Sequence, residues 1–532
     1  MRALTRIAET ALARPLLLAP LLGALAACGF EPLHLWPLSL LGFAGLVMLT
    51  ARAGDLRDAM VAGWLFGVGH FCVGNNWIAT AFTYQANMPA WLGWIAVFML
   101  SLYLAVYPAL ASGIGWHFRR RPAALIPGLA GAWIVSEWLR SWLFTGFAWN
   151  PAGAVLLGGF DGHGLAFLAR WVGTYGLSGL LLLLAGALWW MAGLAAAGQR
   201  QGWAGLAALG LVLAVPLAVP LASDPPGAGL AFTLVQPGIA QDDLDDPAQY
   251  EAQFARTAAL TLPQRPAERR LVLWPESGIP DYLREGYPLY FYEQTTYGAD
   301  PRLARARIAR VLGRGSALLT GAVDLELRRE AVVGARNVVT VIDDGGAIRA
   351  SYAKAHLVPY GEYLPMRALL EPLGLSRLVA GALDYQPGPG PRTLNLGPWG
   401  RAGIQICYEI VFSGQVVDRA HRPDYIFNPT NDGWFGSWGP PQHLAQARLR
   451  AIEEGLPVLR ATTNGISAVI DADGIVRQSL PRPVAGRLDG VVPPPHVPTL
   501  FARGGNIIPL VLAAILLGLG VLALLALRRR NG

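Results

Sequence analysis

Apolar runs long enough to cross a lipid bilayer occur repeatedly in the first 222 residues and once more near the end of the chain. A transmembrane helix needs about 20 consecutive, mainly apolar residues, so each run predicts one helix. Hydrophobic residues make up 53% of the chain and charged residues only 14%, which is unlike a soluble protein. The eight predicted spans are residues 12–28, 34–51, 59–80, 91–117, 123–141, 165–196, 203–222 and 507–527.

A polar block lies between the seventh and the eighth predicted span. It holds most of the acidic residues, together with a normal proportion of bases. We therefore predict an N-terminal membrane domain at residues 1–222, a water-soluble domain at residues 223–506, and a C-terminal transmembrane helix with an arginine tail at residues 507–532. The long sixth span has room for a re-entrant segment.

Arginines collect on alternate loops of the predicted membrane domain, as the positive-inside rule requires of cytoplasmic loops. The loops on the other side have arginine only at their margins, Arg140 and Arg170. We therefore predict that both termini are cytoplasmic and that residues 223–506 lie on the opposite side of the membrane. The arginines assigned to the cytoplasmic side are Arg2, Arg6, Arg14, Arg52, Arg57, Arg119, Arg120, Arg121, Arg200, Arg528, Arg529 and Arg530.

The net charge of +7 fits this topology better than a nucleic-acid partner, because the sequence has no dense basic patch with interleaved aromatic residues. The three cysteines, Cys28, Cys72 and Cys407, indicate neither a metal site nor a disulfide framework, because they lie far apart without metal-ligand spacing. Cys28 follows an apolar run ending in Leu-Ala-Ala, which also resembles a lipoprotein signal. The spans that follow favour a retained first helix.

Short β-rich runs alternate with helical stretches inside the polar block. The helical stretches include residues 301–312 and 443–454. Alternation of this kind predicts an α/β domain with a buried sheet. The predicted strands are residues 229–236, 270–275, 316–323, 337–343, 402–407, 424–428 and 458–462.

Cys407 ends one of these apolar runs, directly before Tyr408 and Glu409. A cysteine at a strand end, with backbone N–H groups nearby, is placed to favour the thiolate and to hold an oxyanion. The alternative is a buried structural cysteine.

Two further residues have the chemistry that a thiol nucleophile needs. Lys354 is the only lysine in a chain that otherwise uses arginine, which suggests a site that needs a compact ammonium charge. Glu276 follows the apolar run 271–275 and can accept and return protons. Chance retention of one lysine and an exposed strand-end acid are the alternatives for these two.

A glutamate after a strand, a lysine and a cysteine in this order resemble the carbon-nitrogen hydrolase, or nitrilase, superfamily. Within it, the chain resembles the apolipoprotein N-acyltransferases over nearly its whole length. The motifs that carry this resemblance are Trp-Pro-Glu-Ser at 274–277, Lys354 with Leu-Val-Pro-Tyr-Gly-Glu at 357–362, Cys-Tyr-Glu at 407–409 and Asn-Asp-Gly-Trp-Phe-Gly at 431–436. The resemblance implies a polytopic α-helical membrane domain and an extracytoplasmic α/β domain of the nitrilase-like αββα sandwich type.

The resemblance also implies the role of each motif residue. Cys407 would be the nucleophile, Glu276 the general base and acid, and Lys354 the group that stabilises the tetrahedral intermediate. Glu362 would orient the lysine or the base. Three further residues would support the site or contact the substrate: Tyr408, Glu409 and Trp434. An ordinary salt bridge is the alternative for the two supporting glutamates, and a core aromatic for Tyr408 and Trp434.

The reaction implied is N-acylation of the diacylglyceryl-cysteine of an apolipoprotein in the bacterial inner membrane, with the catalytic domain on the periplasmic side. A phospholipid would donate the acyl chain through a cysteine thioester, and no metal or organic cofactor is required. Two rivals remain open. One is a membrane-tethered amidase or nitrilase that hydrolyses a small C–N bond. The other is a lipid-binding or transport protein without catalysis.

Three segments have open interpretations. The tyrosine-rich residues 281–296 form either a mobile flap at the membrane or a packed surface loop. The sequence of residues 235–239 departs from the one usual in the family, which puts substrate contacts there in doubt. Glu137 and Arg140 lie three apart at the end of the fifth span, so they either pair with each other or contact an anionic headgroup or the substrate.

Overall fold

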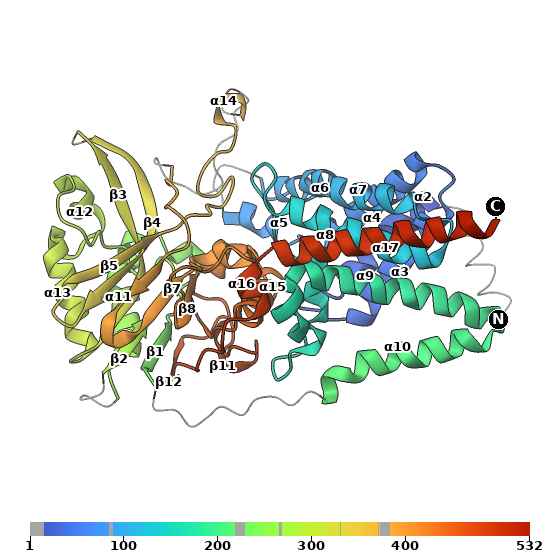
Figure 1. Cartoon of the computed structure of the whole chain (residues 1–532). Helices are drawn as coiled ribbons and strands as arrows, with labels where there is room; N and C mark the ends of the chain where they lie inside the picture. Colours follow the sequence, from blue (N-terminus) through green and yellow to red (C-terminus); the bar gives the residue numbers. More distant parts are fainter. Residues whose placement is uncertain are drawn as a thin grey trace. The chain divides into compact units, whose positions relative to one another are not determined.

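The computed structural model describes residues 15–84, 89–218, 229–264, 269–329, 331–370, 372 and 384–531 (Figure 1). The chain forms two compact units. The helical unit comprises Met1–Ala79, Ala90–Leu221 and Leu500–Gly532. The sheet unit comprises Thr80–Pro89 and Ala222–Thr499.

The helical unit contains apolar helices of membrane-spanning length. Within the described residues, four helical stretches are long and apolar enough to cross a bilayer: Leu92–Trp116, Pro122–Arg140, Gly164–Ala196 and Ile507–Ala526. Two apolar helices are shorter. The prediction of several spanning helices is confirmed, and the number eight and the orientation stay predictions. The helices are α2 (Pro15–Ala27), α3 (Trp36–Arg52), α4 (Leu56–Gly74), α6 (Leu92–Leu104), α7 (Val106–Trp116), α8 (Pro122–Arg140), α9 (Ala169–Ala196), α10 (Arg200–Ala218), α16 (Leu500–Gly504) and α17 (Ile507–Asn531).

The sixth predicted span contains a break in its helix. Gly173 has φ +67° inside α9, a backbone conformation that only glycine adopts without strain. A Cβ atom at this position would also lie 2.2 Å from Cε2 of Phe501, so the position has no room for a side chain. Between α8 and α9 the chain forms two short 3₁₀ helices, η2 (Ala152–Leu156) and η3 (Gly164–Leu168).

Glu137 and Arg140 are buried and hold this irregular segment in place. Their closest side-chain N and O atoms are 3.7 Å apart. Glu137 accepts hydrogen bonds from the Ala152 backbone N–H and from the Ser178 hydroxyl. Arg140 donates to backbone carbonyls within the same segment. Of the two interpretations, the structure favours the internal pair, because paired charges satisfied by backbone groups are tolerated in an apolar interior.

Two six-stranded sheets form the core of the sheet unit. Their strand orders are β12-β1-β2-β3-β4-β5 and β11-β10-β9-β8-β7-β6. In each sheet three neighbouring strands are parallel, β1-β2-β3 in the first and β7-β8-β9 in the second. The strands are β1 (Ala231–Gln236), β2 (Arg270–Leu273), β3 (Ala317–Arg328), β4 (Ala331–Asp343), β5 (Ile348–Ala353), β6 (Thr393–Asn395), β7 (Arg401–Ile404), β8 (Tyr425–Thr430), β9 (Val458–Thr462), β10 (Ser467–Ile470), β11 (Val476–Leu480) and β12 (Gly486–Val491).

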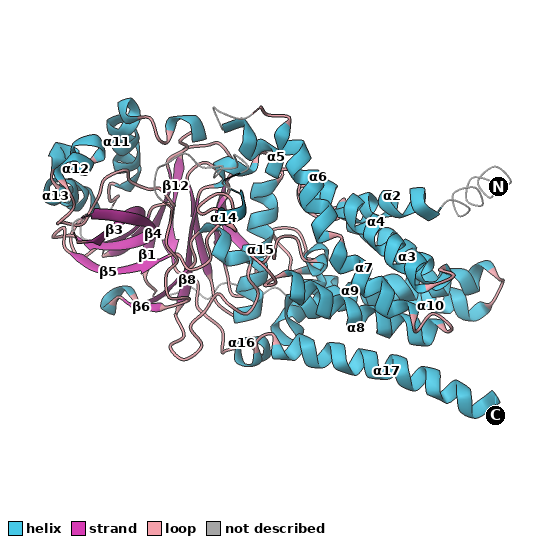
Figure 2. Cartoon of the chain, turned by 90° about the horizontal axis from the view of Figure 1, so that it is seen from above, coloured by secondary structure: helices cyan, strands magenta, loops and turns pink. Residues whose placement is uncertain are grey.

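The two sheets pack against each other and helices cover them. Gln236 at the end of β1 accepts hydrogen bonds from Thr462 Oγ1 (2.9 Å) and from the Ser467 N–H (3.0 Å) of the other sheet. Ile308 and Leu312 of α13 belong to the same buried cluster as residues of β2 and β3. Figure 2 shows the strands gathered between α11–α13 and α15. The covering helices are α11 (Tyr250–Thr261), α12 (Leu289–Thr295), α13 (Pro301–Leu312) and α15 (Gly439–Glu454), and a short α14 (Arg367–Leu370) follows β5. This arrangement is the nitrilase-like sandwich that the sequence predicted.

The parallel strands explain where a site can form. Every residue of β2, β8 and β9 is buried, which is the pattern of strands covered on both faces. Parallel strands bring their carboxyl ends to one edge of a sheet, and side chains that follow them gather there. Glu276 follows β2, and Cys407 follows β7. Two predicted site residues therefore lie at the carboxyl ends of central strands.

Candidate active site

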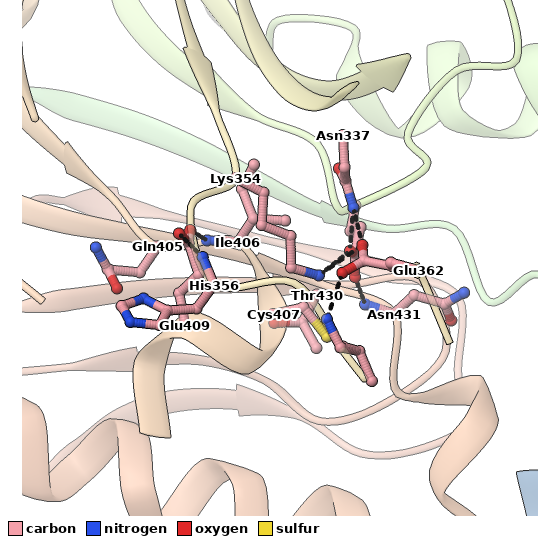
Figure 3. Close-up of polar contacts among 12 residues, drawn as sticks. Asn337, Lys354, His356, Glu362, Gln405, Ile406, Cys407, Glu409, Thr430 and Asn431 are labelled. Carbon is pink, nitrogen blue, oxygen red and sulfur yellow. Dashed lines mark hydrogen bonds and ion pairs between the residues drawn. The ribbon is translucent and has the colours of Figure 1, made fainter. Parts of the chain in front are cut away.

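Glu276, Lys354 and Glu362 form one buried charged cluster in the sheet unit. Nζ of Lys354 lies 3.3 Å from Oε1 of Glu276 and 2.9 Å from Oε1 of Glu362. Lys354 is 1% exposed, and the two glutamates are 7% and 8% exposed. Figure 3 shows the lysine ammonium directed at the Glu362 carboxylate. Two negative groups thus share one cation in a site that largely excludes water.

The two carboxylates determine the charge state of the lysine. Burial alone would lower the pKa of Lys354, because desolvation disfavours the ammonium form. The negative charges of Glu276 and Glu362 outweigh burial and raise this pKa well above its ordinary value. Lys354 is therefore a permanent cation, suited to stabilising a developing oxyanion and unsuited to acting as a base.

Two asparagines complete this cluster, and the sequence reasoning assigned neither of them a role. Nδ2 of Asn337 in β4 donates to Oε1 of Glu276 (2.8 Å) and to Oε1 of Glu362 (3.0 Å). The Asn431 backbone N–H, directly after β8, donates to Oε2 of Glu276 (2.8 Å). Asn337 could have been identified from the sequence, because it is an amide at the start of the predicted strand 337–343.

The backbone around Glu276 passes unusually close to β3. A Cβ atom on Gly321 would lie 2.7 Å from Cα of Glu276, so only glycine fits opposite the glutamate. The Glu276 carbonyl accepts a hydrogen bond from Oγ1 of Thr463 (3.0 Å). Two residues earlier, the fully buried Trp274 donates from Nε1 to Oγ1 of Thr261 (2.8 Å). Hydrogen bonds thus hold the backbone at Glu276 and the side chain two residues before it.

Cys407 is the first residue of a 3₁₀ helix, η9 (Cys407–Val411), which begins three residues after β7 ends. Its φ of +50° lies in the left-handed region, which costs a non-glycine residue about 1–3 kcal/mol. Strain of this kind persists only where surrounding contacts impose it, and it is concentrated at functional sites. The sharp turn after an apolar strand matches the position predicted for the cysteine.

The protonation state of the thiol differs from the expectation. The strand end was expected to favour the thiolate. Instead, burial raises the pKa of Cys407 well above its ordinary value, and the charge of Glu276 raises it further against the opposing effect of Lys354. The resting group is therefore a neutral thiol, with the Glu276 carboxylate near enough to raise its pKa.

Glu409 joins the loop that carries Lys354 to the turn that carries Cys407. Its Oε2 accepts from the Ile406 N–H (2.7 Å). Its Oε1 accepts from the Ala355 N–H (2.7 Å) and from the Tyr352 hydroxyl (2.8 Å). Burial raises the pKa of Glu409 to about 7, although these hydrogen bonds favour its charged form. Glu409 therefore binds backbone N–H groups and a tyrosine hydroxyl, and does not form, among the described residues, the ordinary salt bridge considered as the alternative.

The two aromatic residues of the predicted site have different surroundings. Tyr408 is buried and packs edge-on against Phe412, with ring centroids 5.1 Å apart, as a core aromatic would. Trp434 is partly exposed in the 3₁₀ helix η10 (Asp432–Phe435). Its ring packs edge-on against Tyr84, at a centroid distance of 5.7 Å. Tyr84 comes from the short stretch near residue 80 that belongs to the sheet unit.

The tyrosine-rich segment 281–296 is packed by its own side chains. The Tyr292 hydroxyl donates to the Arg284 carbonyl (2.6 Å) and accepts from the Tyr287 N–H (3.0 Å). Asp281 is ion-paired with Arg307 at 2.8 Å. Of the two interpretations of this segment, these contacts favour the packed surface loop.

Comparison with known proteins identifies relatives of both units. The profile of the apolipoprotein N-acyltransferase N-terminal domain matches residues 22–188, and that of the carbon-nitrogen hydrolases matches residues 234–483. The apolipoprotein N-acyltransferase of Rhodopseudomonas palustris is 36% identical over 538 residues, covering 96% of this chain and 95% of the relative. That of Bradyrhizobium diazoefficiens is 36% identical over 537 residues, covering 96% and 94%.

Solved structures similar to this chain include two of lower identity. An amidase from Nesterenkonia sp. AN1, with an acetamide moiety covalently added at its active-site cysteine, is 18% identical with a TM-score of 0.34. The match covers 51% of this chain and 94% of the amidase. A carbon-nitrogen hydrolase superfamily protein from Xanthomonas campestris is 20% identical with a TM-score of 0.35, covering 50% and 91%.

Proposed function

Since the chain belongs to the apolipoprotein N-acyltransferase family, its activity is the N-acylation of lipoproteins, and we propose that Cys407, Glu276 and Lys354 perform it. One observation carries this assignment. The Cys407 thiol lies within the electrostatic influence of the Glu276 carboxylate and of the Lys354 ammonium, which is 3.3 Å from that carboxylate, and these groups come from elements far apart in sequence. A thiol nucleophile needs a base and a cation in this relation.

The first half-reaction is proposed to begin with the protonated thiol. Glu276 accepts the Sγ proton as Sγ attacks the ester carbonyl carbon of a phospholipid, which forms the C–S bond. The Lys354 ammonium stabilises the oxyanion of the tetrahedral intermediate. When the intermediate collapses, the ester C–O bond breaks and Glu276 returns the proton to the lysophospholipid alcohol. An acyl thioester on Cys407 remains.

The second half-reaction uses the same residues, and Glu276 now protonates the sulfur that it deprotonated before. The free α-amino group of the diacylglyceryl-cysteine of an apolipoprotein attacks the thioester carbonyl. Glu276 takes a proton from the amine and transfers it to the leaving thiolate as the C–S bond breaks. The products are the amide and the resting thiol, so the cycle is a ping-pong reaction. It consumes no cofactor.

The supporting residues are proposed to hold this geometry. Glu362 and Asn337 orient the lysine and the base through the contacts at 2.9 and 2.8 Å. Glu409 fixes the loop of Lys354 to the turn of Cys407. Tyr408 packs against Phe412 within that turn region, and Trp434, partly exposed beside Tyr84, is assigned to the acyl or amine substrate.

The proposed topology follows the arginine distribution. We assign residues 1–222 to a membrane domain with seven spans, 223–506 to the periplasmic catalytic domain and 507–532 to a final span with a cytoplasmic tail. The phospholipid donor and the diacylglyceryl-modified acceptor both reside in the inner-membrane bilayer. A catalytic domain attached to membrane helices can therefore reach both substrates.

The test is the intact mass of the detergent-purified protein after incubation with a phospholipid of defined acyl chain. We expect a mass gain of one acyl chain that hydroxylamine removes and that Cys407→Ala lacks. An unmodified enzyme that instead hydrolyses small amides would support the tethered amidase. A Cys407→Ala variant that complements loss of the enzyme in cells would support the non-catalytic lipid-binding or transport protein. Either result would contradict the proposal.

A further inference from the structure

A second buried polar chain contacts the nucleophile from its backbone side. Nε2 of His443 lies 3.1 Å from the carbonyl oxygen of Cys407. Nδ1 of the same ring lies 3.0 Å from Oδ1 of Asp432. The Arg460 guanidinium binds both oxygens of Asp432, at 2.9 and 2.8 Å. The chain therefore runs from Arg460 through Asp432 and His443 to the residue that carries the thiol.

Each member comes from a different element. Arg460 lies in the middle of β9, and His443 lies in the second turn of α15. Asp432 is the first residue of η10, which follows β8. All three side chains are 0% exposed. Buried charges are costly unless they are fully paired, so a chain of this kind requires each partner to hold the next one in one geometry. These residues connect a strand, a turn and a helix to one backbone carbonyl.

The chemistry of the carbonyl defines the donor. A backbone carbonyl and an ionised carboxylate both only accept hydrogen bonds, so Nε2 and Nδ1 of His443 can donate to Cys407 and Asp432 together only when both carry a proton. Burial and Arg460 lower the pKa of His443, and the charge of Asp432 and the Cys407 carbonyl oppose that shift. With both contacts made, the ring cannot rotate. Burial alone would raise the pKa of Asp432, but Arg460 and His443 lower it below its usual range, so this carboxylate stays charged.

The carbonyl belongs to a strained residue. Cys407 has φ +50°, and its C=O group and the following N–H group lie in one planar trans peptide, where they point in opposite directions. Holding the carbonyl oxygen therefore fixes both the left-handed turn and the direction of the Tyr408 N–H. The same turn sets the direction of the Cys407 Cα–Cβ bond, from which the thiol extends.

We propose that His443, held by Asp432 and Arg460, is a positioning residue that keeps Cys407 in its reactive backbone conformation. The inference rests on the proposed function, in which Cys407 is the nucleophile. It assigns the contact from Nε2 to the Cys407 carbonyl a role in the rate of acylation, distinct from the role of His443 in packing. A misplacement of the reacting atom by about 1 Å can cost about 10²-fold in rate.

A matched pair of substitutions separates the two ring contacts. In His443→Gln the amide nitrogen takes the place of Nε2 and can still donate to the Cys407 carbonyl. In His443→Asn the shorter amide takes the place of Nδ1 and keeps only the contact with Asp432. Both variants remove the ring and its edge-on contact with Phe435, at a centroid distance of 5.7 Å, so they share the loss of packing. They differ in the contact that the proposal requires.

The experiment measures the rate of thioester formation by intact mass, the phospholipid concentration at half-maximal rate, and the thermal unfolding midpoint. We expect His443→Asn to lose about 10²-fold in kcat with little change in KM, and His443→Gln to recover most of that loss. The rate of Cys407 alkylation by iodoacetamide should follow the same order, and this readout needs no lipid. His421→Gln, on an exposed side chain, controls for the substitution itself.

The outcomes distinguish the two proposals. If the wild-type protein forms no thioester, the proposed function fails whatever the variants do. If the wild-type protein is acylated and the Asn variant matches or exceeds the Gln variant in kcat, the positioning role of His443 is overturned. If neither variant folds, Asp432→Asn replaces them, because it removes the charge that holds the ring. A kcat equal to the wild-type value in that variant would equally overturn the inference.

Discussion

Two buried charged clusters meet at Cys407, and they differ in access and in charge. The cluster on the thiol side has two carboxylates around Lys354, and its glutamates retain 7% and 8% exposure. The cluster on the carbonyl side has one carboxylate, Asp432, between Arg460 and His443, and it is fully buried. In the proposed mechanism the first cluster exchanges protons with the substrate and the second holds the backbone of Cys407. The reactivity of Cys407 and its backbone conformation would then depend on separate groups.

Glu276→Gln should have the largest effect on the thiol-side cluster, because it removes the base. We expect acyl transfer to fall by about 10²- to 10⁴-fold. The same substitution removes a negative charge that raises the pKa of Cys407, so the thiol should titrate at lower pH than in the wild-type protein. Thioester formation and the pH dependence of alkylation measure the two effects. An unchanged or raised thiol pKa in Glu276→Gln would contradict the assigned electrostatics.

Lys354→Met should have the next largest effect. The substitution keeps the length of the side chain and removes the charge that stabilises the oxyanion, so we expect kcat to fall by about 10²- to 10³-fold. Lys354→Arg is the matched control, because it keeps the charge but replaces a compact ammonium with a planar fork. Thioester formation measured by intact mass checks both. A Met variant as active as the Arg variant would show that the charge has no catalytic role.

Asn337→Leu tests whether the thiol-side cluster needs its amide. Leucine has nearly the same size but cannot donate to Glu276 and Glu362, which now accept at 2.8 and 3.0 Å. Loss of hydrogen bonds to charged groups should cost about 1.5–3 kcal/mol, and we expect it in kcat. Steady-state kinetics with the unfolding midpoint as a control would check it. If only the midpoint falls, Asn337 serves folding alone.

Tyr292→Phe should have the smallest effect and lies outside both clusters. Its hydroxyl takes part in two hydrogen bonds within segment 281–296, at 2.6 and 3.0 Å. We expect the free energy of unfolding to fall by about 1 kcal/mol with kcat unchanged, because the segment is packed and its tyrosines are structural. Chemical denaturation and thioester kinetics would measure both. A clear loss of kcat would restore the flap as a participant in the reaction.

The thiol-side cluster was largely predictable from sequence, and the carbonyl-side cluster was not. Glu276 and Cys407 each follow an apolar strand, and Lys354 stands out in a chain of arginines, so composition and strand ends identify them. His443 is one of eight histidines and lies in a helix whose sequence gives no sign of a partner. Its contact with residue 407 exists only because β7, β8, β9 and α15 pack together.

Charge states and helix breaks were also beyond the sequence. Whether the Cys407 thiol is ionised depends first on its burial and then on the opposing charges of Glu276 and Lys354, all of which only the fold sets. The seven predicted strands were found, but the described residues contain five more, β5, β6, β10, β11 and β12, that weak alternation did not reveal. The length of the sixth span left room for a re-entrant segment, but the sequence did not locate the break at Gly173.

The inclusion of Thr80–Pro89 in the sheet unit limits how the protein can be dissected. The chain passes between its two units at residues 79/80, 89/90, 221/222 and 499/500. A recombinant fragment that begins at residue 222 would lack Tyr84 and leave the Trp434 ring without its partner. A Cβ atom at Gly436 would lie 2.6 Å from Oγ1 of Thr80. Residue 80 therefore also packs closely against the turn after Trp434. Excising the catalytic half as one continuous piece would therefore yield an incomplete enzyme, and inhibitor screening should use the intact chain.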